Sequence, residues 1–278
     1  MQLVRAALVM ALVLSVTLLL QLVLVSRLQQ SAAQQRAFDS FRADLARGTA
    51  PIGPTDDEGR ELRAGTPVAY LEIPAIGLEQ VIAESTTAAV LFTGPGHRRD
   101  TPLPGQVGAS VVYGRRASFG GPFARIDELT KGDTIRITTG QGQFTYRVLG
   151  VRRQGDPVPE ALSPGKARLL LATADGRPFL PDGVLRVDAD LESDAVVGPA
   201  RLVTAADLPA EEQIMAGDPR TLWALALWLQ ALIALALVAV WAWHRWGKPQ
   251  AWVVFLPPLL LVGLSASGEV ARLLPNLS

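Results

Sequence analysis

The residues best placed to do chemistry in this sequence follow a run typical of a strand, residues 109–113, and lie in the glycine-rich loop at 114–123. The loop holds two adjacent arginines, Arg115 and Arg116. Loops at strand ends commonly carry functional groups, and a guanidinium matches the geometry of a carboxylate or phosphate. It stays protonated above about pH 12, so it cannot serve as a base near neutrality and is a very poor acid. The loop is therefore suited to anion binding and not to acid–base catalysis.

Other reactive groups are scarce along the chain. There is no cysteine, which excludes disulfides, thiolate metal sites and thiol nucleophiles together. The hydroxyls of Ser118 and Thr173 could attack a substrate only with an activating base, for which His97 is the candidate; the other histidine, His244, lies in the link between two apolar stretches. We expect no metal site and no cofactor, since no loop is rich in carboxylates. The net charge is zero, which predicts no general attraction to nucleic acid.

Three apolar stretches, residues 6–26, 222–243 and 251–268, are long enough for helices that cross a bilayer. The first is longer than the apolar region of a secretory signal, so we predict an uncleaved anchor, with a cleaved signal peptide as the alternative. Tryptophans near both ends of the second are typical of the membrane interface. The third contains Pro257 and Pro258, which predicts a kink. It is a full span or, alternatively, a re-entrant or interfacial segment.

The short link between the second and third stretches, residues 244–248, is positively charged and is typical of a cytoplasmic loop. We therefore predict a multi-pass protein of the cytoplasmic membrane with a cytoplasmic N-terminus and residues 27–219 outside the cytoplasm. The chain divides into an N-terminal anchor, a stalk and linker, a β-rich domain, a second linker and a C-terminal transmembrane hairpin, at residues 1–27, 28–66, 67–192, 193–219 and 220–278.

The β-rich domain consists of short runs separated by turn residues. Residues 134–138 alternate polar and apolar side chains, and residues 144–149 pair back across a turn that contains Gly140 and Gly142. Further runs lie at residues 68–73, 81–82, 110–113, 169–173 and 184–187. Seven or eight strands with almost no room for long helices predict a mostly β fold, a closed β-barrel.

Four motifs in this domain resemble those of the sortase family, the membrane-anchored cysteine transpeptidases of the bacterial surface. They are I-P-A-I-G at 73–77, T-G-P-G-H at 93–97, T-P-L-P-G-Q-x-G at 101–108 and F-G-G-P-F-A-R-I-D-E-L-x-x-G-D at 119–133. Over residues 69–191 the chain resembles a class E-like sortase of Gram-positive actinobacteria. The resemblance implies an eight-stranded sortase barrel with short helices. It also implies cleavage of a sorting signal by a cysteine and transfer of the acyl group to an amine.

Two catalytic residues of the family are replaced in the matching stretches. Arg115 stands at the histidine position, and Ala174 stands at the cysteine position, after an aliphatic strand. Arg186 is the nearest match to the family's arginine, displaced by two residues, which keeps it on the same face of a strand. The resemblance therefore implies a degenerate member without catalytic residues. An active transpeptidase or hydrolase with a rebuilt site is the alternative.

The arginines around this position allow two interpretations. In the first, they converge and bind an anion or a peptide, together with His97; the set comprises Arg98, Arg99, Arg115, Arg116, Arg177 and Arg186. In the second, which we favour, they are solvated surface side chains in an arginine-rich chain. The hairpin at 220–278 is more than anchoring requires. We therefore predict a binding or scaffolding subunit that associates with another membrane or cell-surface protein, such as a transporter, a secretion component or an active sortase.

Overall fold

The computed structural model describes residues 16–17, 25–56, 58–177, 180–200, 202–214, 221–246, 248–273 and 277. The chain forms two compact units. One comprises Arg27–Ala216 with Pro275–Ser278, and the other comprises Met1–Ser26 with Gly217–Leu274. The first predicted span, within residues 1–27, lies outside the described residues except for Val16, Thr17 and residues 25–27.

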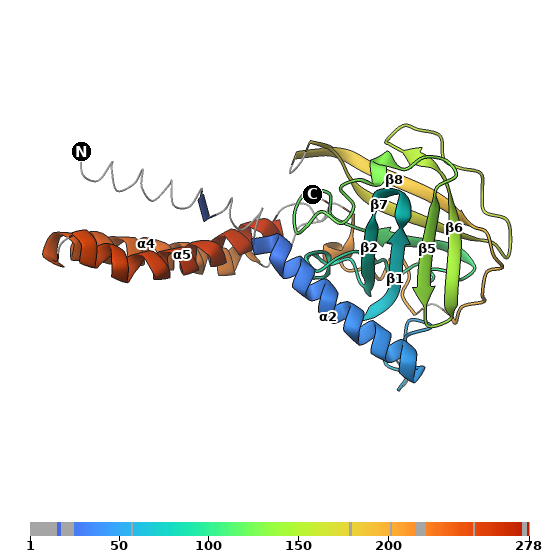
Figure 1. The fold of residues 1–278 in the computed structure, drawn as a ribbon, viewed down its shortest axis with the longest axis horizontal. Coiled ribbons are helices and arrows are strands. Elements are labelled where there is room, and N and C mark those ends of the chain that lie inside the picture. The colour runs from blue at the N-terminus through green and yellow to red at the C-terminus, as the bar shows by residue number, and fades with distance from the viewer. Residues whose placement is uncertain are drawn as a thin grey trace. The chain divides into compact units, whose positions relative to one another are not determined.

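Eight strands form a closed barrel within the described part of residues 67–191 (Figure 1). They run in the spatial order β1-β2-β3-β4-β7-β8-β6-β5, and β5 pairs with β1 to close the barrel. Neighbours are antiparallel except for the parallel pairs β2–β3 and β4–β7. The strands are β1 (Pro67–Ile73), β2 (Leu78–Glu84), β3 (Gly96–His97), β4 (Gly108–Tyr113), β5 (Thr134–Thr139), β6 (Gly142–Arg152), β7 (Ala167–Arg177) and β8 (Leu180–Leu191). The predicted barrel is confirmed, and β3 is the strand that no apolar run indicated, because it has only two residues.

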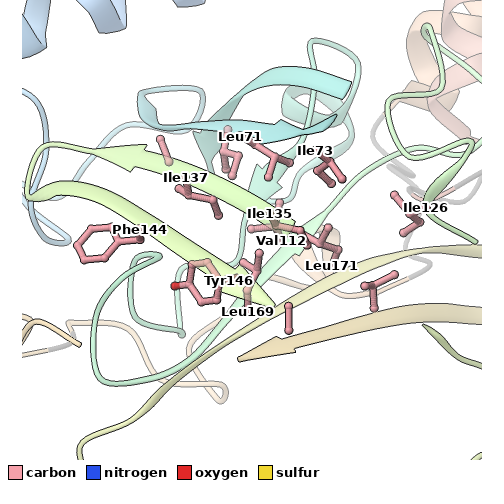
Figure 2. Packing of buried hydrophobic residues seen from close by; sticks show 14 of the residues in the cluster. Leu71, Ile73, Val112, Ile126, Ile135, Ile137, Phe144, Tyr146, Leu169 and Leu171 are labelled. Atoms are coloured by element: carbon pink, nitrogen blue, oxygen red, sulfur yellow. The ribbon is translucent and has the colours of Figure 1, made fainter. Parts of the chain in front are cut away.

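One face of each long strand fills the barrel interior. Residues two apart on a strand share a face, so Leu169 and Leu171 of β7 belong to the core together with Val112 of β4. Figure 2 shows these side chains meeting Ile135 and Tyr146 from the opposite wall. Each fully buried aliphatic side chain stabilises the fold by about 1.5–3 kcal/mol. The intervening residues of β4, β7 and β8 therefore face away from the core.

Short helices accompany the barrel, as predicted; three lie in its connections and η4 follows β8. They are the α-helix α3 (Ala88–Leu91) and the 3-10 helices η2 (Pro74–Ile76), η3 (Ile126–Glu128) and η4 (Ala210–Glu212). Ile126 of η3 reaches the core cluster together with Phe123, so the chain that follows β4 is anchored from inside the barrel.

The two stretches predicted as stalk and linkers pack on the barrel. Helix α2 (Ser26–Arg47) lies in the predicted stalk, and its Gln34 side chain bonds to the backbone of Val81 at 2.7 and 3.2 Å. Leu62 is part of the barrel core although residues 48–66 have the composition of a flexible linker. In the second linker, the amide of Val107 donates to the carbonyl of Val196 at 2.9 Å. Long-range contacts fix the described parts of both stretches, which local composition does not reveal.

The other unit contains two long apolar helices, α4 (Thr221–Trp246) and α5 (Lys248–Leu273), which pack against each other. Within the described residues, Leu222–Trp243 and Val253–Val270 are long and apolar enough to cross a membrane. Pro257 and Pro258 lie inside α5. A side chain at Gly263 would come within 3.1 Å of the Thr17 hydroxyl, so this small residue allows a close approach between segments of the same unit.

Candidate functional site

Ala174, which stands at the expected nucleophile position, lies on the outward face of β7. Cross-strand partners share a face, and the register pairs Ala174 with Val184 and Ala172 with both Tyr113 and Arg186. Buried apolar residues on this side form a second cluster, separate from the barrel core. We call it the outer-face cluster; its buried members are Leu91, Tyr113, Ala172, Ala174 and Leu277.

The side chain of Ala174 is a methyl group and offers no nucleophile. The neighbouring hydroxyl of Thr173 lies on the opposite, inward face, where Thr173 pairs with Leu185 of the core. It donates a hydrogen bond to the carbonyl of Gly114 at 2.8 Å. This hydroxyl therefore fastens the end of β4 to β7 and does not point toward the outer-face cluster.

Three glycines shape the loop that follows β4. A Cβ at Gly114 would lie 2.4 Å from the ring of Phe123, and one at Gly121 would lie 2.4 Å from the carbonyl oxygen of Arg116. Gly120 and Gly121 also have positive φ angles of 76° and 53°, which favour glycine. The amide of Phe123 donates to the carbonyl of Arg115 at 3.0 Å, so the loop closes over itself. This geometry turns the Arg115 side chain into the protein.

The guanidinium of Arg115 is fully buried. It lies 4.6 Å from the ring centroid of Phe92 and 5.5 Å from that of Phe119, whose rings stack on each other at 4.0 Å. One of its NH groups donates to the hydroxyl of Ser118 at 2.9 Å. Burial lowers the pKa of Arg115 to about 9. The prediction that these arginines are solvated surface side chains is wrong for Arg115. The closed loop buries its side chain, and Phe92 packs against it from a segment that is distant in the sequence.

Arg116 is held by groups of its own domain. It donates to the carbonyl of Ala174 at 3.0 Å and to the carboxylate of Asp127 at 2.9 Å. A second carboxylate, that of Asp175, lies 3.6 Å away. Asp175 also lies 3.3 Å from Arg153. Arg116 therefore ties the loop to the end of β7, and its charge is compensated locally.

The remaining arginines of the predicted set are distributed among separate contacts. Arg98 pairs with Asp100 at 2.7 Å, and Arg99 pairs with Glu61 at 2.7 Å and with Glu212 at 3.4 Å. Arg177 is exposed at the end of β7. Arg186 lies on the same outward face as Ala172, consistent with the expected strand face. Arg98 and Arg186 both interact with the Tyr113 hydroxyl and therefore lie close together. Arg99 and Arg115 are held in other contacts, so the six arginines do not meet in one cluster.

His97 is buried on the opposite side of the sheet from Ala174. Its register partner is Val112, a core residue. The Nδ1 atom lies 2.8 Å from the Glu84 carboxylate, and the Nε2 atom lies 3.0 Å from the carbonyl oxygen of Pro102. Burial alone would lower the pKa of His97, but the adjacent Glu84 carboxylate outweighs it and raises the pKa. The imidazole of His97 is therefore held in a buried ion pair with Glu84. The hydroxyls of Thr173 and Ser118 have hydrogen-bond partners other than His97.

A cavity of about 370 Å³ lies beside this ion pair. Its walls include His97, Glu84, Arg99 and Gln106, with further residues from the 53–54 and 197–200 segments. Ala174 and Arg115 do not contribute to it. The cavity is therefore a feature of the inward side of β2 and β3 and not of the position where the resemblance puts the nucleophile.

Comparison with known proteins agrees with the motifs. The family model described as the sortase domain matches residues 71–179. The barrel belongs to the sortase family. Sortase D of Bacillus subtilis (strain 168) is 40% identical over 79 residues, which are 28% of this chain and 38% of that protein. The matched part of the sortase domain thus spans well under half the length of this curated relative.

Solved sortase structures resemble the chain at the level of the fold. A sortase D5 transpeptidase of Clostridium perfringens is 23% identical with a TM-score of 0.48, and the match covers 58% of this chain and 99% of that one. Sortase E of Streptomyces avermitilis is 28% identical with a TM-score of 0.41, and the match covers 55% of this chain and 100% of that protein.

Three residues of the site escaped the sequence analysis. Phe92 lies in an unremarkable stretch, and Phe119 was assigned only to a motif, yet the two rings cover Arg115. Leu277, near the C-terminus, lies on the outer-face cluster. A glycine-rich loop that contains phenylalanines beside an arginine was a usable signal for Phe119. No local pattern connects Leu277 to the sortase domain.

Proposed function

We propose that this protein is a catalytically inactive sortase-domain protein that acts as a binding or scaffolding subunit at the outer face of the cytoplasmic membrane. The observation that carries the proposal is the pair of groups at the two replaced positions. Acyl transfer needs a nucleophile and a group that moves protons. Ala174 has a methyl group, and the Arg115 guanidinium is buried under two aromatic rings.

A rebuilt active site finds little support in the local contacts. A catalytic hydroxyl needs a base within hydrogen-bond distance, about 2.6–3.2 Å. The hydroxyl of Thr173 bonds to the carbonyl of Gly114, and the hydroxyl of Ser118 accepts from Arg115. The imidazole of His97 bonds to Glu84 and Pro102. The two hydroxyls and the imidazole are thus each hydrogen-bonded to structural groups, and neither hydroxyl is paired with the imidazole.

The apolar hairpin supports a role in the membrane beyond the anchoring of one domain. Large apolar side chains on both helices are exposed, among them Trp223 at 82%, Leu237 at 66% and Val253 at 75%. Such surfaces suit lipid or a partner helix. We propose that α4 and α5 span the membrane with their positively charged link in the cytoplasm, and that the sortase domain lies outside.

Turnover is the direct test. The purified full chain in detergent is incubated with peptides that carry cell-wall sorting signals and with an amine acceptor, and cleavage and transfer are followed by mass spectrometry. We expect neither product at any enzyme concentration that gives full conversion with an active sortase. The proposal is refuted if the wild-type chain cleaves the peptide. Loss of that cleavage in Thr173→Ala or His97→Ala, in a variant that still resists proteolysis as the parent does, would then identify a rebuilt site.

A further inference from the structure

Leu277 is buried on the outer-face cluster although it lies one residue from the end of the sequence. It belongs to the same compact unit as the barrel, and its exposed fraction is 0%. The side chain packs with Leu91, Tyr113 and Ala172, and with Ala174 itself. Full burial of this side chain among residues of β4 and β7 indicates a specific contact with the outward face of β7.

The backbone of Leu277 is bound as well. Its carbonyl oxygen accepts a hydrogen bond from the amide of Arg116 at 3.0 Å and lies 3.4 Å from the amide nitrogen of Ala174, which also donates to it. The parallel pairing of β4 with β7 ends at the pair of Tyr113 and Ala172, because the loop after β4 turns away. The amide of Ala174 therefore loses its partner from β4. The carbonyl of Leu277 takes that place, in the way that an added strand completes a sheet edge.

We propose that the segment around Leu277, which follows α5, is a built-in ligand of this chain's own sortase domain. Leu277 occupies the outer-face cluster in cis, over the position where the nucleophile is replaced, so an external extended peptide with an apolar side chain binds there only after the tail has left. Burial of a leucine side chain together with two hydrogen bonds, less the conformational entropy lost on ordering the segment, favours the docked tail by about 10–100-fold. The tail is tethered, so an external peptide also competes with a high local concentration.

A docked Leu277 covers the site whether or not the domain has catalytic activity. Crosslinking and hydrogen exchange report whether Leu277 is docked, whereas the peptide-cleavage assay reports catalysis. Failure of this proposal is therefore distinguishable from failure of the proposed function.

The absence of cysteine makes crosslinking unambiguous. The full-length double variant Arg186→Cys/Ser278→Cys leaves Leu277 and Ala172 in place, and Arg186 pairs with Ala172 on the outward face. It is treated with a short bis-maleimide in detergent and in lipid nanodiscs. We expect an intramolecular crosslink, detected by mass spectrometry of the monomer band. The control is Val158→Cys/Ser278→Cys, since Val158 is 76% exposed and lies outside the cluster. A crosslinked dimer, or equal crosslinking in both variants, would overturn the assignment in cis.

Hydrogen exchange tests the two amides directly. In Leu277→Asp, and in a chain that lacks residues 275–278, exchange at the amides of Arg116 and Ala174 should become at least about tenfold faster. The amide of Gly114, which donates to Ala172, serves as the internal reference. Val158→Asp is the matched surface control and should change neither amide. Unaltered protection at Arg116 and Ala174 in both tail variants would overturn the proposal, and neither variant disturbs the barrel core.

Discussion

Replacement of Arg115 by methionine should leave the barrel nearly as stable as the parent, despite the full burial of the site. The guanidinium lies between Phe92 and Phe119 and donates to Ser118. Methionine is of similar length, carries no charge and makes favourable contacts with aromatic rings. The variant therefore keeps the packing of the loop and removes only the electrostatic part of the interaction.

The expected magnitude follows from the cost of burying the charge. Burial lowers the pKa of Arg115 to about 9, so the charged form is held under Phe92 and Phe119 at a net electrostatic cost on the order of several kcal/mol. Arg115→Met removes this cost together with the hydrogen bond to Ser118. Replacement of a buried charge by an apolar side chain of similar volume is often neutral or stabilising by about 1–4 kcal/mol. Arg115→Met should therefore lower the free energy of unfolding by no more than about 2 kcal/mol.

The pH dependence has a definite sign. The pKa of Arg115 is lower in the folded state, so above about pH 9 and below the ordinary pKa of arginine the unfolded chain binds more protons and the stability of the parent rises with pH. From pH 8 to pH 10 the parent should gain on the order of 1 kcal/mol relative to Arg115→Met.

Pulse proteolysis in urea suits this measurement, because the six tryptophans all lie in residues 223–252 and their fluorescence does not follow the barrel. The full chain is used in detergent at pH 7, 8 and 10. Arg115→Ala is the control and should cost about 2–5 kcal/mol, since it leaves a cavity under the rings. A loss above about 3 kcal/mol for Arg115→Met, or no pH-dependent difference from the parent, would refute the account of a guanidinium that is buried at a net electrostatic cost.

Two further predictions concern the inward face and the hairpin. His97→Ala should destabilise the barrel by about 3–5 kcal/mol, because the Glu84 carboxylate stays buried without its counter-ion. The raised pKa of His97 means that this contribution is complete below about pH 6.5 and is lost as pH rises through the folded-state value, so a flat pH profile of the urea midpoint would contradict it. Deletion of residues 220–278 should abolish copurification of a membrane partner from native membranes, quantified by mass spectrometry, whereas deletion of 275–278 alone should not. Equal recovery with all three chains would remove the reason to assign the hairpin a partner.

The barrel could be predicted from the sequence because its strands carry a local signature. The alternation at residues 134–138 and the turn between β5 and β6 are properties of adjacent residues, and the structure has both. The two-residue strand β3 carries no such pattern. The stretch at 48–66 was misjudged for a related reason, since Leu62 is ordered by core residues far away in the chain and its own surroundings are polar.

The sequence by itself determined which chemistry residues 115 and 174 lack, because nucleophilicity and protonation depend first on the atoms that a side chain contains. A methyl group at Ala174 and a guanidinium at Arg115 follow from the residue types alone. Only the tertiary structure decided that Arg115 is buried beneath Phe92 and that Leu277 lies over Ala174. Burial depends on segments that are distant along the chain, and no local pattern of residues encodes which of them will meet.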